Sequence, residues 1–404
     1  MTDQQAGIGE RSVSPVLAVG FLVIAVAVGV GAGALLAGSQ GSTTSAGSSG
    51  SPATSDGTGL ASGPPATPAA TPTPTPTPTP SPEPTPVLVP APLTGLPVTE
   101  AAAWLHPIAV MVDDHRDARP QSGFNAAAQV WQAPAEGGVP RYMLIFQDAR
   151  PAAVGPIRSA RQYFIDWASE WTAMYVHVGG SPEAMATLRS SGAGQLVYNA
   201  DGFRFEGTDM WRIKERAAPH NVYTDADHLG SMAAKVGAAG GPVEPVWAFG
   251  DATRAVDRPS GTTIAIHYPY ETITYRYQPT TNTYARFIDG AVTPQVDAAD
   301  GRPVAPTNVV IIRMRFGALN DGHPEKKRLD AEDVGSGQAI ISTNGRIIEG
   351  TWTKAAADAP TLLFGPDGLP IALTAGQTFV QVIALSYAYE VVEGTAPDAG
   401  IRER

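Results

Sequence analysis

VGPIRSARQYFIDWASEWTAMYVHVGGSPEA, residues 154–184, is the stretch from which the fold of this chain can be predicted outward. Its first half carries the signals of a helix. Ser159 is a suitable N-cap, and Gln162 three residues later completes a capping-box pattern. One apolar face at helical spacing follows, formed by Phe164, Ala168 and Trp171. The pattern predicts an amphipathic helix that covers a core.

The second half of the stretch predicts a buried strand and another helix. Residues 173–178 are a short apolar run with aromatic and β-branched side chains, which is typical of a buried strand. Gly179 and Gly180 end this run. Ser181 is then a suitable N-cap for a helix in which Pro182 occupies the first turn.

The lengths of these elements predict where their ends meet. A helix of about 12 residues spans roughly 18 Å, and a strand of about six residues spans roughly 20 Å. A strand that folds straight back therefore ends level with the start of its helix, where the second helix also begins. Both helix starts carry unpaired N–H groups and partial positive charge. Arg158 and Arg161 stand there too, so we predict an anion-binding site, filled either by a ligand or by a carboxylate of the chain.

The composition limits the classes of protein to which the chain can belong. With 404 residues, 43% of them hydrophobic, the chain can form two ordinary domains besides its low-complexity segments. A formal net charge of -11 argues against nucleic-acid binding, which depends on basic surfaces. The absence of cysteine excludes disulfides, thiolate catalysis and cysteine-based zinc sites.

The amino-terminal segment predicts a membrane anchor. Residues 15–37 contain no charged side chain and are long enough to cross a bilayer as a helix. Arg11 is the flanking cation, which by the positive-inside rule places residues 1–14 in the cytoplasm. We favour an uncleaved anchor over a cleaved signal peptide, because a signal-peptide core is usually shorter. Ser39 stands where a lipoprotein processing site requires cysteine, so no lipid can be attached at that residue.

Residues 38–90 have the composition of a disordered stalk. The first half is rich in Gly, Ser, Thr and Ala, and residues 71–86 alternate Pro with Thr or Ser apart from Glu83. A Pro-rich segment of this kind extends by about 3.1 Å per residue. No hydrophobic core can form from such a composition, so we expect the stalk to hold the folded part away from the membrane.

Residues 91–236 show the mixed pattern of an α/β or α+β domain. Besides the helix–strand–helix stretch, strands are predicted at residues 107–112, 130–133, 139–146 and 195–198. Asn125 is predicted to cap a short helix, and Thr224 is predicted to cap a helix at residues 226–236.

Residues 262–395 form a β-rich region, which follows a linker at residues 237–261 and precedes a tail at residues 396–404. Alternating or β-branched runs predict strands at residues 262–267, 272–277, 284–288, 309–316, 338–342, 346–352 and 378–385. Asn344 and Gly345 predict a tight hairpin. The predicted fold is therefore a mixed α/β amino-terminal domain followed by a β-rich, sandwich-like carboxyl-terminal domain.

Several stretches of the chain resemble a known family. They are HPIAVMVDDHRDARPQSGF (106–124), APAEGGVPRYMLIFQ (133–147), VGPIRSARQYFIDWA (154–168), MYVHVGGSPEA (174–184), APHNVYT (218–224), GSGQAIISTNGRIIEGTWTK (335–354) and LTAGQTFVQVIAL (373–385). In these the chain resembles the YerB-like bacterial lipoproteins over most of its length beyond residue 90. The resemblance implies an envelope-associated protein of two such domains, and it implies no reaction and no catalytic residues. Many relatives keep the lipidated cysteine that Ser39 replaces here.

The predicted anion site is assigned to residues of the amino-terminal region. Arginine forks and helix N-termini together are suited to a carboxylate or a phosphate. The candidate ligand-binding residues are Arg119, Glu136, Arg141, Arg158, Arg161, Gly179, Gly180, Ser181, His220 and Asn221. The alternative is an internal network, in which Glu183, Glu136 or Asp113 neutralises the arginines.

Asp113, Asp114 and His177 are the candidate catalytic residues. Two carboxylates after a strand can act as acid and base or ligate a hard metal, with His115 and His220 as further candidates. The structural alternative is that the aspartates close a turn and that a histidine in an apolar strand is a hydrogen-bonded core residue. Because the histidine spacing matches no zinc signature, no metal site and no cofactor is assigned.

These observations together predict a single-pass cell-membrane protein whose globular domains lie outside the cytoplasm. The amino-terminal domain is expected to bind an anionic envelope component, as a binding protein rather than an enzyme. A metal-assisted or acid–base hydrolase of envelope material and a scaffold for another envelope protein are the alternatives. The expected partners are the membrane, through the amino-terminal helix, and the anionic component or an envelope protein, but not nucleic acid.

Overall fold

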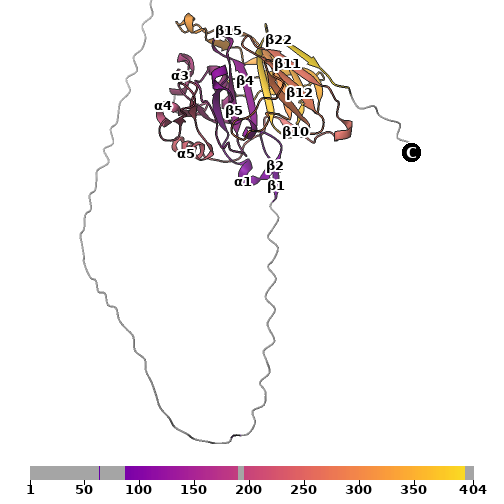
Figure 1. Cartoon of the computed structure of the whole chain (residues 1–404), viewed down its shortest axis with the longest axis horizontal. Coiled ribbons are helices and arrows are strands. Elements are labelled where there is room, and N and C mark those ends of the chain that lie inside the picture. Colours follow the sequence, from indigo (N-terminus) through magenta and orange to yellow (C-terminus); the bar gives the residue numbers. More distant parts are fainter. Residues whose placement is uncertain (1–62, 64–86, 190–194, 396–404) are drawn as a thin grey trace, which may run out of the picture. The chain divides into compact units, whose positions relative to one another are not determined.

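A ten-stranded sheet is the largest element of the structure, a computed structural model that describes residue 63, residues 87–189 and residues 195–395. Strands from both predicted regions take part in this sheet (Figure 1). From one edge to the other the strands are β19 (Leu362–Phe364), β18 (Arg346–Lys354), β17 (Gly335–Thr343), β14 (Asn308–Met314), β21 (Thr378–Ala384), β4 (Gln129–Pro134), β5 (Pro140–Phe146), β3 (Ile108–Asp113), β6 (Met174–His177) and β7 (Tyr198–Asp201). The described residues from 87 onward belong to one compact unit.

The two predicted regions meet in the middle of this sheet, at the parallel pair of β21 and β4. Thr378 lies opposite Gln129, and Gln381 lies opposite Gln132. Both strands are buried along their whole length, as is β5 beside them. The sheet is therefore continuous across the join, and the bounds predicted for the two domains stay a prediction.

A four-stranded antiparallel sheet packs on one face of the large sheet. Its strands are β13 (Thr283–Ile288), β12 (Thr272–Gln278), β11 (Thr263–His267) and β22 (Ala388–Val392). Figure 1 shows β11, β12 and β22 at the right of the folded part and α3, α4 and α5 at its left. Four two-stranded pairs complete the strands: β1 (Leu88–Pro90) with β2 (Pro97–Thr99), β8 (Trp211–Arg212) with β9 (Val222–Tyr223), β10 (Ala248–Gly250) with β20 (Ala372–Thr374), and β15 (Phe316–Ala318) with β16 (Leu329–Ala331).

Few helices are present among the described residues. The α-helices are α1 (Glu100–Ala103), α2 (Gln162–Ala168), α3 (Pro182–Arg189), α4 (Gly202–Phe205) and α5 (Ala226–Val236). Short 3₁₀ turns are η1 (Arg116–Ala118), η2 (Phe124–Ala126), η3 (Glu136–Gly138), η4 (Ser169–Trp171), η5 (Ala255–Asp257) and η6 (Pro324–Lys326). The structure is thus mostly β, and the finer division into a mixed α/β domain and a sandwich-like domain stays a prediction.

The large sheet separates two hydrophobic cores. Along β3, Val110 and Val112 face the core shared with the four-stranded sheet and α5, whereas Met111 faces the core beneath α2. This alternation follows from the two-residue period of a strand. In the second core Trp131 stacks on Trp167 of α2, with ring centroids 5.1 Å apart.

The predicted helix–strand–helix order of residues 154–184 is confirmed by α2, β6 and α3. Val178 N donates to Arg158 O over 3.0 Å, and Ala160 N donates to Gly179 O over 2.9 Å. The end of β6 therefore lies beside the start of α2, as the element lengths predict. Ser181 precedes α3, and its Oγ accepts a hydrogen bond from Ala184 N at 3.4 Å.

The prediction that Ser159 caps α2 is wrong. Arg161 occupies the N-cap position and makes no capping hydrogen bond with its side chain. The hydroxyl of Ser159 instead accepts from Arg141 Nη1 at 2.7 Å. A bridge between Ala160 and Gly180 holds the chain extended up to the helix start, so the helix begins later than the capping pattern suggests.

Two other predicted caps are also wrong. Asn125 begins no helix, because only the short turn η2 forms before β4 starts at Gln129. The helix predicted at residues 226–236 is confirmed as α5, but its cap is Asp225, whose side chain accepts from His228 N. Thr224 instead donates its hydroxyl hydrogen to Asp209 O.

The strand predictions are confirmed with small shifts at the ends. The seven strands predicted in residues 262–395 correspond to β11, β12, β13, β14, β17, β18 and β21. Asn344 and Gly345, at φ 51° and 73°, connect β17 to β18 as the predicted hairpin. The strand predicted at residues 195–198 is displaced and appears as β7.

The predicted amino-terminal segments are only partly covered by the structure. No helix among the described residues is long and apolar enough to cross a membrane. Residues 1–14, the predicted anchor at 15–37, most of the predicted stalk at 38–90 and the tail at 396–404 lie outside the described residues. β1 begins at Leu88, inside the range predicted for the stalk.

Candidate functional site

A pocket at the carboxyl end of β3 corresponds to the predicted anion site. We call it the arginine pocket. It has a volume of about 260 Å³ and is lined by Asp113, His115, Glu136, Val139, Arg141, Arg158 and Ser159. Asp113 is the last residue of β3 and lies opposite Arg141 of β5. Arg158 enters from the segment before α2, whose backbone is held by a bond from Arg158 N to Met111 O at 3.0 Å.

Arg158 is the cation of this pocket that keeps its hydrogen-bond donors free. Its Nε lies 3.0 Å from Asp113 Oδ2, but the approach angle makes this an ion pair rather than a hydrogen bond. Within the described part of the chain the guanidinium donates no hydrogen bond, and 24% of the side chain is exposed. Burial lowers the pKa of Arg158, and the Asp113 carboxylate opposes this effect. The group remains a charged fork that an oxyanion can bind.

Glu136 pairs with both of the other arginines near the pocket. Arg141 donates to Glu136 Oε2 over 2.9 Å and to the hydroxyl of Ser159 over 2.7 Å. Arg161 pairs with the other oxygen of Glu136, and only 3% of its side chain is exposed. Burial lowers the pKa of Arg161 to about 10. For Arg141 and Arg161 the structure therefore contains the internal pairing that was the alternative to a ligand.

The backbone groups predicted to bind the anion are used within the fold. Gly179 N donates to Asp201 Oδ1 over 3.1 Å, and Ser181 N donates to Ala160 O over 3.2 Å. Gly180 forms the bridge with Ala160. These contacts join α2, β6 and β7, and Gly179, Gly180 and Ser181 do not line the arginine pocket.

Arg119 lies in a separate, buried polar cluster with Asp114, Gln132, Glu271 and Arg286. Arg119 Nη2 is 3.1 Å from Asp114 Oδ1 and also contacts Glu271. Gln132 Nε2 donates to Asp114 Oδ2 over 2.6 Å and to Glu271 Oε1 over 2.8 Å. Burial raises the pKa of Asp114 to about 6, although Arg119 and Arg286 oppose the shift. The ion pairs and hydrogen bonds of this cluster are those of an internal network, although Arg119 Nε has no partner among the described residues.

The three candidate catalytic residues belong to different hydrogen-bond networks. Asp113 faces the arginine pocket, whereas Asp114 is enclosed in the buried cluster. His177 is fully buried, and its ring nitrogens lie 2.8 Å from Gly179 O and 2.8 Å from Asn199 Oδ1. A shared acid–base role needs groups that reach one substrate, and their catalytic assignment stays a prediction.

His220 and Asn221 come from the segment before β9. His220 Nδ1 lies 2.6 Å from Asp113 Oδ2, so this histidine reaches the edge of the arginine pocket. The side chain of Asn221 holds its own loop, donating to Ile213 O and Arg216 O over 3.1 Å each. The structure thus brings His220, but not the side chain of Asn221, to the group around Asp113.

Sequence reasoning missed several residues of these networks. Asp117 was not among the predicted site residues, although it lies on η1, two positions after His115. Glu271 and Arg286 contact residues of the amino-terminal region from 139 and 144 positions away. The sequence signal for such partners is weak, because a single buried charge within a strand or turn does not indicate its partner.

Asp333 is a buried carboxylate outside these networks, and it should make the stability of the fold depend on pH. Burial, with a smaller contribution from Asp166, raises the pKa of Asp333 to about 7. Its Oδ2 has no partner among the described residues. A raised pKa in the folded state means that the folded state binds the proton more tightly. The contribution of Asp333 to the free energy of unfolding is therefore most favourable below pH 4 and is lost as the pH rises from about 4 to about 7.

We expect Asp333→Asn to be more stable than the wild type at pH 8, by on the order of 2 kcal/mol, and to differ little from it at pH 4. Urea unfolding at both pH values measures this difference. Asp358→Asn, at an exposed position, is the matched control and should leave both values unchanged. An equal gain at both pH values would show that the charge of Asp333 is not the cause.

Comparisons with known proteins agree with the resemblance seen in the sequence. Residues 93–239 match the family described as "Protein of unknown function (DUF3048) N-terminal domain", and residues 264–380 match the corresponding C-terminal domain. The chain is 31% identical over 302 residues to "Putative lipoprotein YerB" of Bacillus subtilis (strain 168), covering 72% of this chain and 86% of that protein. The crystal structure of YerB protein from Bacillus subtilis superposes with a TM-score of 0.65 at 28% identity, over 74% of this chain and 99% of that one.

Proposed function

The chain belongs to the YerB-like family of two-domain proteins, and from this we propose that it is a membrane-anchored protein of the bacterial cell envelope whose folded part lies outside the cytoplasm. The name of the Bacillus subtilis relative, a putative lipoprotein, supports this location. The 404 residues contain no cysteine, and we therefore propose the apolar segment at residues 15–37 as a single-pass anchor in place of a lipid. Deletion of these residues should release the protein from the membrane fraction, and persistent membrane association would contradict the anchor.

We propose further that the folded part binds an anionic group of an envelope component in the arginine pocket. The observation that carries this proposal is the state of Arg158, which is partly exposed and pairs with Asp113 but donates no hydrogen bond within the described residues. Arg141 lies beside it and is held in place by Glu136 and Ser159. A carboxylate or phosphate oxygen in the pocket would accept hydrogen bonds from the N–H groups of Arg158 that have no partner among the described residues.

The test is a binding titration with the full-length protein. The probes are inorganic phosphate and soluble fragments of the cell wall, whose peptides end in carboxylates. Because a hydrogen bond to a charged group contributes about 1.5–3 kcal/mol, we expect Arg158→Ala to weaken binding by about 10- to 100-fold. Arg158→Lys should retain part of the affinity, since it keeps the charge but loses the fork.

Arg315→Ala is the matched control, because it removes the same charge from a side chain that is 70% exposed and outside the pocket. It should change the affinity by less than about twofold. Unfolding midpoints of both variants show whether the fold is intact. Equal affinity of Arg158→Ala and the wild type for every probe would remove the proposed site.

At the level of domains, we propose that residues 91–236 are a mixed α/β domain and that residues 262–395 are a β-rich, sandwich-like domain. The helices α2, α3 and α5 all lie in the first range, and the four-stranded sheet lies in the second. The matches to two separate domain families over residues 93–239 and 264–380 support this division.

A further inference from the structure

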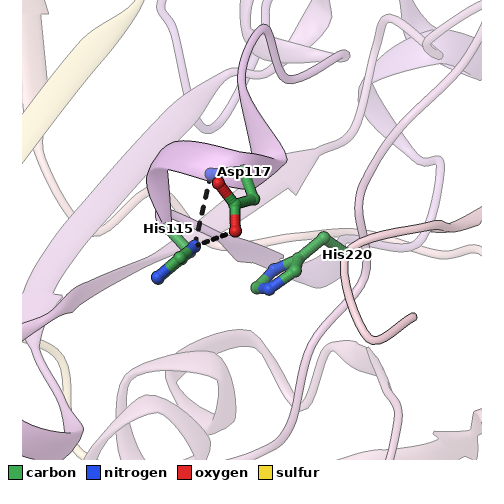
Figure 2. A group of neighbouring side chains, drawn as sticks. All are labelled: His115, Asp117 and His220. Atoms are coloured by element: carbon green, nitrogen blue, oxygen red, sulfur yellow. Dashed lines mark hydrogen bonds and ion pairs between the residues drawn. The ribbon is translucent and has the colours of Figure 1, made fainter. Parts of the chain in front are cut away.

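Two histidines and an aspartate come together in the fold, as Figure 2 shows, and one of them, His115, lines the arginine pocket. His115 follows β3, Asp117 lies on η1, and His220 comes from the segment before β9. The imidazole rings of His115 and His220 are stacked, with centroids 4.7 Å apart and planes 18° from parallel. One ligand atom from each of the three residues lies within 4.8 Å of the others. We propose that His115, Asp117 and His220 bind a divalent transition-metal ion such as Zn²⁺.

The orientation of His220 supports a role as a metal ligand. Its Nδ1 lies 2.6 Å from Asp113 Oδ2. Because the carboxylate can only accept, Nδ1 carries the hydrogen, which leaves Nε2 as the ring nitrogen that can bind a metal. Nε2 has no hydrogen-bond partner in the described part of the chain, whereas Asp113 is buried and fixed by further contacts. A carboxylate that orients a histidine in this way is the usual outer partner of a metal-binding imidazole.

The other two ligands are near the surface and can adjust. The side chains of His115 and Asp117 are 37% and 74% exposed. His115 Nδ1 is 3.2 Å from Asp117 N and 3.5 Å from Asp117 Oδ2. Tetrahedral coordination at about 2.1 Å places ligand atoms about 3.4 Å apart. Coordination therefore requires these two exposed side chains to rotate towards His220, which is 15% exposed, from the present separation of up to 4.8 Å.

The chemistry of the three groups selects the class of metal. Two imidazoles and one carboxylate suit Zn²⁺, Co²⁺, Ni²⁺ or Cu²⁺, whereas Mg²⁺ and Ca²⁺ prefer oxygen ligands. The carboxylate of Asp117 supplies one negative charge to a divalent ion, whereas the carboxylate of Asp113 is shared between His220 and Arg158. Three protein ligands leave a coordination position open, and His115 also lines the arginine pocket. The site goes beyond the proposed anion binding and does not depend on it.

The experiment is a metal titration of the full-length protein, purified without a histidine tag and stripped of metal with a chelator. Isothermal titration with Zn²⁺ should show one ion per chain with a dissociation constant in the micromolar range or below. Loading with Co²⁺ should give the visible absorption of nitrogen coordination. His220→Ala and His115→Gln should each weaken Zn²⁺ binding by at least about tenfold, and Asp113→Asn should weaken it by about 10- to 100-fold.

His228→Gln is the matched control, because His228 is paired with Asp225 on α5 and lies outside the proposed site. It should bind Zn²⁺ like the wild type. His115 is at the surface, so His115→Gln remains informative even if His220→Ala fails to fold. Absence of stoichiometric Zn²⁺ binding to the wild type, or equal affinity of His115→Gln and the wild type, overturns the proposal.

Discussion

Replacing Lys354 by methionine is expected to lower the free energy of unfolding by about 3–5 kcal/mol. Lys354 Nζ lies 2.9 Å from Glu170 Oε1, and both side chains are 0% exposed. Thr361 Oγ1 also donates to this oxygen over 2.6 Å. Without the ammonium group, the Glu170 carboxylate would be buried with no opposite charge. Burial already raises the pKa of Glu170, and Lys354 opposes this effect.

The pair also joins elements that are far apart in the chain. Glu170 lies on η4 after α2, and Lys354 is the last residue of β18. A double variant, Lys354→Met with Glu170→Gln, should recover much of the loss, because it removes both buried charges. Urea unfolding of the wild type, both single variants and the double variant measures the coupling. Lys326→Met, at an exposed position of η6, is the control; a single-variant loss below about 1 kcal/mol would contradict the argument.

Replacing Arg286 by methionine is expected to cost about 3–5 kcal/mol as well. Arg286 is fully buried on β13, and its guanidinium donates to Gln132 Oε1 and to Tyr142 OH over 2.9 Å each. It also donates to Tyr275 OH over 3.2 Å. Without Arg286, these acceptors would lose a hydrogen bond. The buried Asp114 would also lose the favourable electrostatic interaction with the guanidinium group.

Arg286 connects the four-stranded sheet to β4 and β5 of the ten-stranded sheet. Replacing it should therefore destabilise both sheets together. Tryptophan fluorescence and far-UV circular dichroism should report one coincident transition, shifted to lower urea in Arg286→Met. Arg315→Met, at a position 70% exposed, should leave the midpoint unchanged. Two separate transitions in the wild type would show that the regions unfold independently and that this arginine does not couple them.

Structural features that are specified by residues close together in the sequence could be predicted. The alternation of apolar residues indicated β11 and β12, because a strand buried on one face has a two-residue period. Asn344 and Gly345 indicated their hairpin because the turn needs positive φ at both positions. Ser181 and Pro182 indicated the start of α3. Each of these signals lies within a few residues of the structure that it specifies.

The candidate site was predictable only in part. The element lengths placed Arg158 at the carboxyl edge of the sheet, where it lines the arginine pocket. They could not separate it from Arg161, three residues on, which is turned into the fold and paired with Glu136. Ser159 carried a capping pattern, yet its hydroxyl accepts from Arg141. In both cases a partner from another strand or turn decides between two locally acceptable arrangements.

The sequence by itself determined most strands of the two larger sheets, the helices α2, α3 and α5, and the placement of arginines beside the end of β6, whereas β19 and β22 were not predicted and β7 was displaced. Only the tertiary structure decided that β21 lies beside β4, that Glu136 pairs with two of the arginines, and that His220 lies against His115 across 105 positions of the chain. The physical reason is that local patterns specify backbone conformation and the buried face. The choice of partner for a strand edge or a buried charge depends on which distant segments the whole core brings together.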